Sequence, residues 1–156
     1  MKRDFLSFEV FSVLRAPAEK VWAHAISLDG VNAELAPIAR MTAPPGASLD
    51  PSHVVLGQRL FRSWILAFGV LPIDYDDITL IELEPGRRFL ERSPMLSQAM
   101  WEHERVIEPQ GSESCTVRDR VRFRPRLWLL GRMQKPLFHL TFINRHRNLR
   151  RMFGRR

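Results

Sequence analysis

The sequence predicts a single α+β domain in which helices gather on one side of an antiparallel sheet. Alternating apolar and polar residues, interrupted by short turns, fill the region from 57 to 124. Two helix-like segments precede this region, and a period of three to four residues replaces the alternation near residue 134. The chain has 156 residues, 45% of them hydrophobic, so one domain over 1–156 can bury a core.

The N-terminal part contains one predicted strand and two short helices. The segment 5–15 is rich in Phe and Val with polar residues between them, which is typical of a strand. A helix is predicted over 16–27, with Pro17 in its first position, where a missing N–H costs nothing. A second helix is predicted over 28–37, with Asp29 as its N-cap.

The middle of the chain predicts a meander of antiparallel strands. A loop rich in Pro, Gly and Ser at 42–52 precedes it, and a brief additional strand is compatible with 38–41. The connections are short and rich in turn residues, as in hairpins. The predicted strands cover 58–68, 73–83, 87–93, 98–108 and 114–124.

The last segment predicts one long amphipathic helix. Pro136 is tolerated only in the first turn, so we expect the helix to begin near 134 and to end near 153, with Gly154 after its C-cap. One face of this helix, at intervals of three to four residues, carries Phe138, Phe142, Arg145, Leu149 and Met152.

Composition and motifs exclude several classes of protein. The single cysteine, Cys115, leaves no internal disulfide framework, suits a cytoplasmic protein, and is predicted to be a buried hydrophobe and not a nucleophile. The longest apolar stretches, such as 64–73, fall far short of the ~20 residues that a membrane span needs. We expect neither a metal nor a cofactor, because the histidines lack metal-site spacing and no nucleotide-binding fingerprint occurs.

The stretch VRDRVRFRPR at 117–126 alternates arginines with other residues. In a strand, alternate side chains point to opposite faces, so the arginines share one face and Val117, Val121 and Phe123 the other. The preceding strand would place Glu102, Glu104 and Glu108 across from the arginines, where opposite charges stabilise a ladder. We therefore interpret the row as a solvated, paired face. A nucleic-acid surface is less favoured, because Phe123, which could stack on bases, lies on the opposite face.

The same alternation places His103, Arg105 and Asp119 on the inner face. Buried charges are costly unless they are paired, so we predict an Arg105–Asp119 ion pair with His103 beside it. Two readings stay open. Either the trio only anchors the sheet, or Arg105 or His103 orients the polar head of a ligand, as a few convergent polar groups do in apolar pockets.

Other polar residues are weaker candidates. Tyr75, Asp76 and Asp77 form a polar group in one predicted strand, where Tyr75 could supply a hydroxyl to a cavity. The two carboxylates could serve acid–base chemistry or form a surface patch.

A basic cluster ends the chain, and it is either a solvated helix face or a contact with an anionic membrane. Its residues are Arg145, Arg147, Arg150, Arg151, Arg155 and Arg156.

Four segments carry a resemblance to a known family: APAEKVW at 16–22, DGVNAELAP at 29–37, WEHERVIEPQGSESCTVRDRVRFRP at 101–125 and FINRHRNLRRMF at 142–153. Their order resembles the helix-grip fold of the START-like superfamily (SRPBCC), which includes lipid-transfer domains and polyketide cyclase/dehydrases. The resemblance implies a curved sheet of six to seven strands, wrapped around the C-terminal helix and enclosing an apolar cavity. It implies no fixed chemistry.

We expect the protein to bind or carry a hydrophobic small molecule, such as a lipid, an isoprenoid or a polyketide-like compound. The expected walls are Trp101, Val117, Val121, Phe123, Phe138 and Phe142, and the expected polar groups are Tyr75, His103, Arg105 and Asp119. The first alternative is a cyclase or dehydratase in which Arg105 polarises a carbonyl and His103 or Tyr75 transfers a proton. The second is a module that contacts membrane or nucleic acid through its arginine-rich tail.

Overall fold

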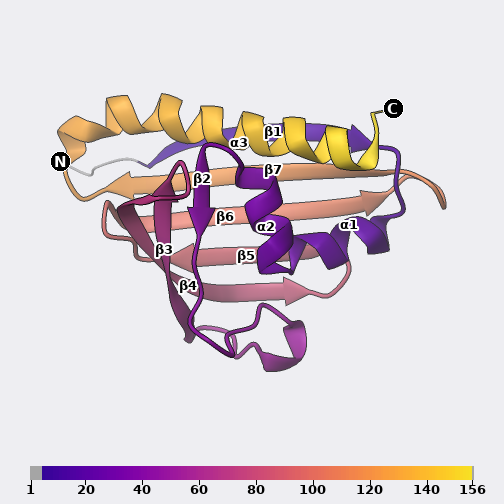
Figure 1. Cartoon of the computed structure of the whole chain (residues 1–156), viewed down its shortest axis with the longest axis horizontal. Helices are drawn as coiled ribbons and strands as arrows, with labels where there is room; N and C mark the ends of the chain where they lie inside the picture. The colour runs from indigo at the N-terminus through magenta and orange to yellow at the C-terminus, as the bar shows by residue number, and fades with distance from the viewer. Residues whose placement is uncertain (1–4, 156) are drawn as a thin grey trace.

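A computed structural model describes residues 5–155. In this part of the chain seven strands form one antiparallel sheet in the order β1-β7-β6-β5-β4-β3-β2. The strands are β1 (Leu6–Leu14), β2 (Ala39–Met41), β3 (Arg59–Ala67), β4 (Leu71–Glu84), β5 (Arg88–Ser93), β6 (Gln98–Pro109) and β7 (Cys115–Pro125). Figure 1 shows β2 and β3 turned steeply against β5, β6 and β7, so the sheet curls into a half-barrel.

Helices cover the concave side of this sheet. The long helix α3 (Gly131–Phe153) packs along β1, and α2 (Leu28–Leu35) packs against α3. Helix α1 (Ala18–Ala25) lies beside α2 and against β6, and short 3₁₀ turns occupy Pro51–His53 and Trp128–Leu130 (Figure 1). The predicted α+β class and element order are confirmed, and the predicted strands agree with the structure to within two residues at each end. No helix among residues 5–155 is long and apolar enough to cross a membrane.

Two helix starts differ from the sequence predictions. The N-cap of α2 is Ser27, whose hydroxyl accepts a hydrogen bond from the Gly30 N–H, so the assignment of Asp29 as the cap is wrong. Helix α3 begins at Gly131 and not near 134, because the 3₁₀ turn before it leads directly into the helix. Pro136 therefore lies inside α3, where its ring removes one backbone hydrogen bond.

Gly131 allows close packing at the start of α3. A Cβ atom at this position would lie 2.9 Å from Leu6 Cδ1 and 3.1 Å from Pro125 Cγ. A larger residue would therefore require the Leu6 side chain and the Pro125 ring to move, whereas glycine lets the helix begin directly against the ends of β1 and β7.

The β6–β7 hairpin has the predicted orientation. Trp101 pairs with Phe123, His103 with Val121, and Arg105 with Asp119, and all six of these residues are buried. The arginines of β7 lie on the outer, convex face, which confirms that the alternating row is a paired, solvent-facing surface.

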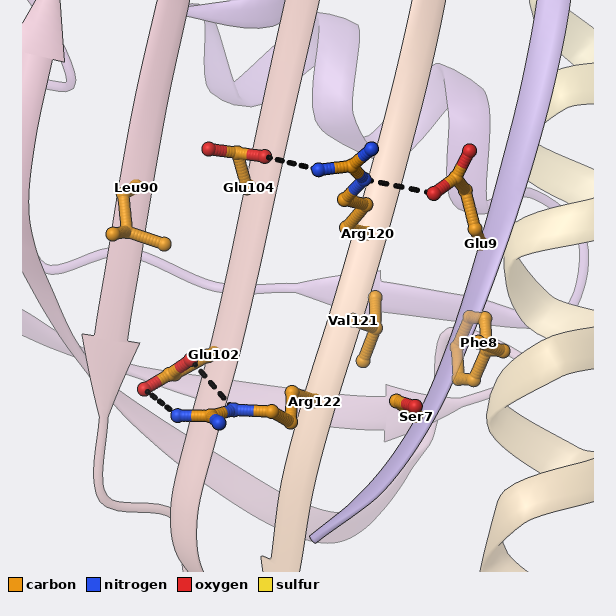
Figure 2. Close-up of a pocket in the computed structure, with 9 residues that line it drawn as sticks. All are labelled: Ser7, Phe8, Glu9, Leu90, Glu102, Glu104, Arg120, Val121 and Arg122. Atoms are coloured by element: carbon orange, nitrogen blue, oxygen red, sulfur yellow. Dashed lines mark hydrogen bonds and ion pairs between the residues drawn. The ribbon is translucent and has the colours of Figure 1, made fainter.

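Figure 2 shows a shallow depression on this outer face, where Arg120 lies between Glu104 and Glu9 and Arg122 contacts Glu102. Arg120 Nε is 2.7 Å from Glu9 Oε2, and Arg122 NH2 is 3.1 Å from Glu102 Oε1. Glu108 departs from the expected ladder, because its partner across the hairpin is Thr116.

Two apolar clusters form the interior of the described part of the chain. One joins β1, β6, β7, α1 and the end of α3, and includes Leu14, Trp22, Ile107, Val117 and Leu149. The other joins the first half of β6 and the second half of β7 to the middle of α3, and includes Trp101, Val121, Phe123 and Phe142. Buried charged side chains of β6, β7, α2 and α3 add a polar layer to this interior.

Candidate functional site

An internal hollow lies between the curled part of the sheet and α3. Its volume is about 440 Å³, and we call it the main hollow. The sheet contributes Met41, Ile65, Ile73 and Trp101 to its wall, the β5–β6 connection contributes Met95, and α3 contributes Leu137, Phe138, Leu140 and Phe142. Phe68, Ile73, Leu137 and Leu140 line the hollow and are also exposed, so it opens between the β3–β4 turn and α3. This size and lining suit a mostly apolar small molecule.

A small hollow of about 90 Å³ lies on the other side of a polar boundary. It is lined mainly by apolar residues of α1, α2, β4 and β5, among them Ile26, Val31 and Phe89. Both hollows share five lining residues, and we call this boundary the waist. Its residues are Met41, Asp76, Glu91, His103 and Arg145.

A buried ionic network lies behind the waist and is centred on Arg105. Its guanidinium donates to Asp119 through Nε (2.8 Å to Oδ1) and NH2 (2.8 Å to Oδ2). It also donates to Glu34 through NH1 (3.0 Å to Oε2) and NH2 (2.7 Å to Oε1). The predicted Arg105–Asp119 ion pair is therefore confirmed, and His103 lies beside it, with Nε2 2.8 Å from Asp119 Oδ1.

Helix α2 supplies Glu34, the second carboxylate of this network. Glu34 also accepts a hydrogen bond from Arg145 Nε at 3.1 Å, and His24 Nε2 lies 3.1 Å from its Oε2. Burial alone would raise the pKa of Glu34, but Arg105 and Arg145 together hold it far below its ordinary value. Burial opposes ionisation of Asp119 as well, and there Arg105 and His103 hold the pKa well below the usual range. Two guanidiniums thus balance two ionised carboxylates in the core.

Ser12, His146 and Asp119 form a hydrogen-bonded chain within the same core. Ser12 Oγ lies 2.7 Å from His146 Nδ1, and His146 Nε2 lies 2.7 Å from Asp119 Oδ2. The residue types are those of a nucleophilic triad, but all three side chains are buried and none lines either hollow. Ser12 Oγ also accepts a hydrogen bond from Arg150 NH1 at 2.9 Å. The chain therefore ties β1, β7 and α3 together and has no access to a substrate.

A second pair of acids, Asp76 and Glu91, behaves differently from the network. Both side chains are buried at the waist, and their carboxyl groups lie within hydrogen-bonding reach of each other. Burial, and then the neighbouring Glu91, raises the pKa of Asp76 well above its usual range. Ser93 Oγ donates to Glu91 Oε2 at 2.8 Å, while Asp76 Oδ1 has no hydrogen-bond partner among the described residues.

The structure brings only some of the predicted site residues to the hollow. Trp101, His103, Phe138 and Phe142 line it. The structure places the other inward-facing candidates in the packed core or the ionic network and not on the wall: Arg105, Val117, Asp119, Val121 and Phe123.

The expectation that Tyr75 supplies a cavity hydroxyl is wrong. Asp74 and Asp76 occupy the inner face of β4, so Tyr75 points outward, where its ring packs edge-on against Trp64. The Arg62 guanidinium covers the Tyr75 ring at 3.9 Å, which stabilises the outward orientation through a cation–π contact.

Glu34, Glu91, Arg145 and His146 were not among the predicted site residues. For Arg145 a signal existed, because it shares its predicted helix face with Phe142 and Leu149, both of which are buried. Arg145 is 7% exposed, so it does not belong to an exposed basic cluster, and Arg150 is engaged with Ser12. Exposed members of the cluster are Arg147, Arg151 and Arg155, while Arg156 lies outside the described residues.

The arrangement resembles that of known proteins. A START superfamily protein from Mycobacterium smegmatis superposes with a TM-score of 0.60 at 15% identity, over 96% of this chain and 97% of that one. The Zhui aromatase/cyclase from Streptomyces sp. R1128 gives 0.60 at 12% identity, over 93% and 91%. Norcoclaurine synthase from Thalictrum flavum, solved in complex with dopamine and hydroxybenzaldehyde, gives 0.62 at 10% identity, over 95% and 86%.

The curled seven-stranded sheet packed around a long C-terminal helix is the helix-grip fold of START-like (SRPBCC) structures, as the sequence resemblance implied. No curated protein matches the sequence. The model of the family described as Domain of unknown function (DUF8410) matches residues 12–153, and the chain belongs to that family.

Proposed function

We propose that the protein binds a hydrophobic small molecule in the main hollow. The observation that carries this proposal is an apolar space of about 440 Å³, walled by aromatic and aliphatic side chains and open to the surface beside α3. The structural neighbours support it at the level of the fold, since they include a START superfamily protein and an aromatase/cyclase. The boundary of the hollow provides a small number of polar groups that can fix the orientation of a ligand.

The test blocks the hollow with a larger side chain. Thr141 lines the hollow from α3, and Thr141→Phe would fill part of it, whereas Lys135→Phe adds the same ring to an exposed position of the same helix. Native mass spectrometry and a displacement assay with the uncharged apolar dye Nile red would compare both variants with the wild-type protein. We expect Thr141→Phe alone to lose ligand. Equal binding by both variants, or no bound apolar compound in the wild-type protein, overturns the proposal.

A second candidate is proton-transfer catalysis in the same hollow, because His103 lines it and is held by Asp119. Arg105 cannot polarise a substrate as the sequence suggested, since its side chain is 1% exposed and is surrounded by carboxylates. Dehydration of 4-hydroxy-4-phenyl-2-butanone, followed by the absorbance of the enone product, tests this candidate. Acceleration by the wild-type protein and its loss in His103→Gln support catalysis, and a rate equal to the buffer rate excludes it for this reaction.

We also propose that any contact with anionic membranes uses Arg147, Arg151 and Arg155, because these arginines of the basic cluster are exposed. Sedimentation with vesicles of phosphatidylcholine and phosphatidylglycerol measures this contact. Arg147→Gln with Arg151→Gln should release the protein from the vesicles, and binding that is unchanged by both substitutions rules this contact out.

A further inference from the structure

The carboxyl groups of Asp76 and Glu91 lie next to each other in the boundary between two apolar hollows. Asp76 is 3% exposed and comes from β4, and Glu91 is 8% exposed and comes from β5. Both residues line the main hollow and the small hollow. A ligand in either space therefore meets the same two acids.

No cation within residues 5–155 forms an ion pair with either acid. The other buried acids differ in this respect, because Glu34 and Asp119 each contact a guanidinium at 2.7–2.8 Å. Asp74, a further buried acid of β4, accepts hydrogen bonds from the Ser97 N–H and hydroxyl. Within the described part of the chain, the one hydrogen-bond donor to the Asp76–Glu91 pair is the Ser93 hydroxyl, and Asp76 Oδ1 has no hydrogen-bond partner. A buried acid pair of this kind has an unused capacity to bind a cation.

The groups that face the pair come from four elements. Asp74 from β4 and Ser93 from β5 are adjacent to it, while His103 from β6 and Arg145 from α3 complete the waist. His103 bonds to Asp119 and Arg145 bonds to Glu34, so each has its own acidic partner in the network. His103 and Arg145 therefore do not neutralise the acid pair. Its negative charge is instead reduced by a proton, because the pKa of Asp76 is raised.

We propose that the Asp76–Glu91 pair binds the ammonium group of an apolar amine, whose hydrocarbon part fills the main hollow. This inference rests on the proposed function of the main hollow and specifies the class of ligand. An ammonium group has three N–H donors, which can bond the free oxygen of Asp76 and the carboxylate of Glu91. When the ammonium binds, the proton held by the pair passes to solvent, so that two carboxylates share one alkylammonium.

Other head groups fit the waist less well. A ligand carboxylate or phosphate would be repelled by the acid pair. An alcohol can donate or accept one hydrogen bond there, but it brings no charge to compensate the carboxylate. Selectivity for an amine over ligands with the same apolar body is therefore the signature of this site.

The experiment compares three ligands that share one phenylbutyl body: 4-phenylbutylamine, 4-phenylbutanol and 4-phenylbutyrate. Isothermal titration calorimetry at pH 7.5 should show the amine binding at least about tenfold more tightly than the other two, as expected for charge-assisted hydrogen bonds. Asp76→Asn with Glu91→Gln should remove this preference, so that the amine no longer binds more tightly than the alcohol. Asp77→Asn, one residue away on the outer face and paired with Arg62, is the matched control and should bind as the wild-type protein does.

A second measurement does not depend on the variants. Titration of the wild-type protein in buffers of different ionisation enthalpy should show net proton release with the amine and none with the alcohol. Equal affinity for all three ligands, or amine binding without proton release, overturns the amine site but leaves ligand binding in the hollow intact. Binding of the alcohol without binding of the amine also overturns the amine site alone. If none of the three ligands binds, both the amine site and the proposed function are contradicted.

Discussion

Arg105 and Asp119 lie directly opposite each other in the β6–β7 hairpin and are joined by two hydrogen bonds of 2.8 Å. The same guanidinium also bonds Glu34 on α2, so one side chain connects the hairpin to the helical layer. This connection is buried, and charged groups of this kind contribute to stability only while every partner is present.

We expect Arg105→Leu to destabilise the fold strongly. The substitution leaves the carboxylates of Glu34 and Asp119 without their main cation, and loss of one partner of a buried pair typically costs about 3–5 kcal/mol. Urea unfolding, followed by circular dichroism, gives the change in the free energy of unfolding. Arg122→Leu, which breaks an exposed pair with Glu102, should cost less than about 1 kcal/mol. Similar losses in the two variants would contradict the central role of Arg105.

The pKa of Glu34 predicts how stability changes in acid. Because this pKa is lower in the folded protein than in the unfolded chain, the folded state binds fewer protons in the intervening pH range. The stabilisation is therefore complete above about pH 5 and is lost as the pH falls below the ordinary pKa of about 4.3. Asp119 acts in the same direction.

Glu34→Gln should accordingly be less stable than the wild-type protein at pH 7, and its unfolding free energy should fall less steeply between pH 5 and pH 3 (about one pH unit either side of the ordinary carboxyl pKa). Glu113→Gln, at an exposed turn position, is the control and should keep the wild-type slope. Parallel profiles for the wild-type protein and Glu34→Gln would show that Glu34 has no such linkage.

The raised pKa of Asp76 predicts the opposite dependence of stability on pH. Its raised pKa means that the folded state holds a proton that the unfolded chain releases, so stability falls as the pH rises above about 4. Asp76→Asn removes this penalty, and it should raise the unfolding free energy at pH 8 by about 1 kcal/mol or more, the equivalent of one pKa unit. The gain should shrink as the pH is lowered toward 4. Melting temperatures at several pH values provide the measurement, and an asparagine variant that is less stable at pH 8 refutes the assignment.

The hydrogen bonds of His146 predict its tautomer. Asp119 can only accept, so His146 Nε2 must carry a proton, and Nδ1 then accepts from the Ser12 hydroxyl, which itself accepts from Arg150. We therefore expect the Nε2–H tautomer. Two-bond ¹⁵N–¹H correlation spectra distinguish the tautomers, with Ser12→Ala as the comparison. A proton on Nδ1 alone would show that the Ser12 contact runs in the other direction.

Much of the fold could be predicted because its signals are local. Alternation along 101–108 and 115–124 identified the inner and outer faces of the hairpin and hence the buried Arg105 and Asp119. The acids and bases that meet these two residues come from elements far away in the sequence, and alternation within one strand does not show which elements meet. Glu34 lies 71 residues from Arg105 in the sequence, and for this reason its contact with Arg105 was not predicted.

The error at Tyr75 has a different cause. An aromatic residue between aspartates favours an inward ring and outward carboxylates, yet β4 has the reverse orientation. Trp64 and Arg62 of β3 provide the ring with an outer packing site, and Ser97 and Glu91 provide partners for the inward acids. Neighbouring strands thus determine which side of β4 faces inward.

The waist separates spaces of about 440 Å³ and about 90 Å³, and this inequality has a consequence for ligand shape. A nitrogen held by Asp76 and Glu91 has room for one large substituent on one side and for a methyl or ethyl group on the other. Secondary amines with one short arm should therefore fit, whereas amines with two bulky arms should be rejected by size alone.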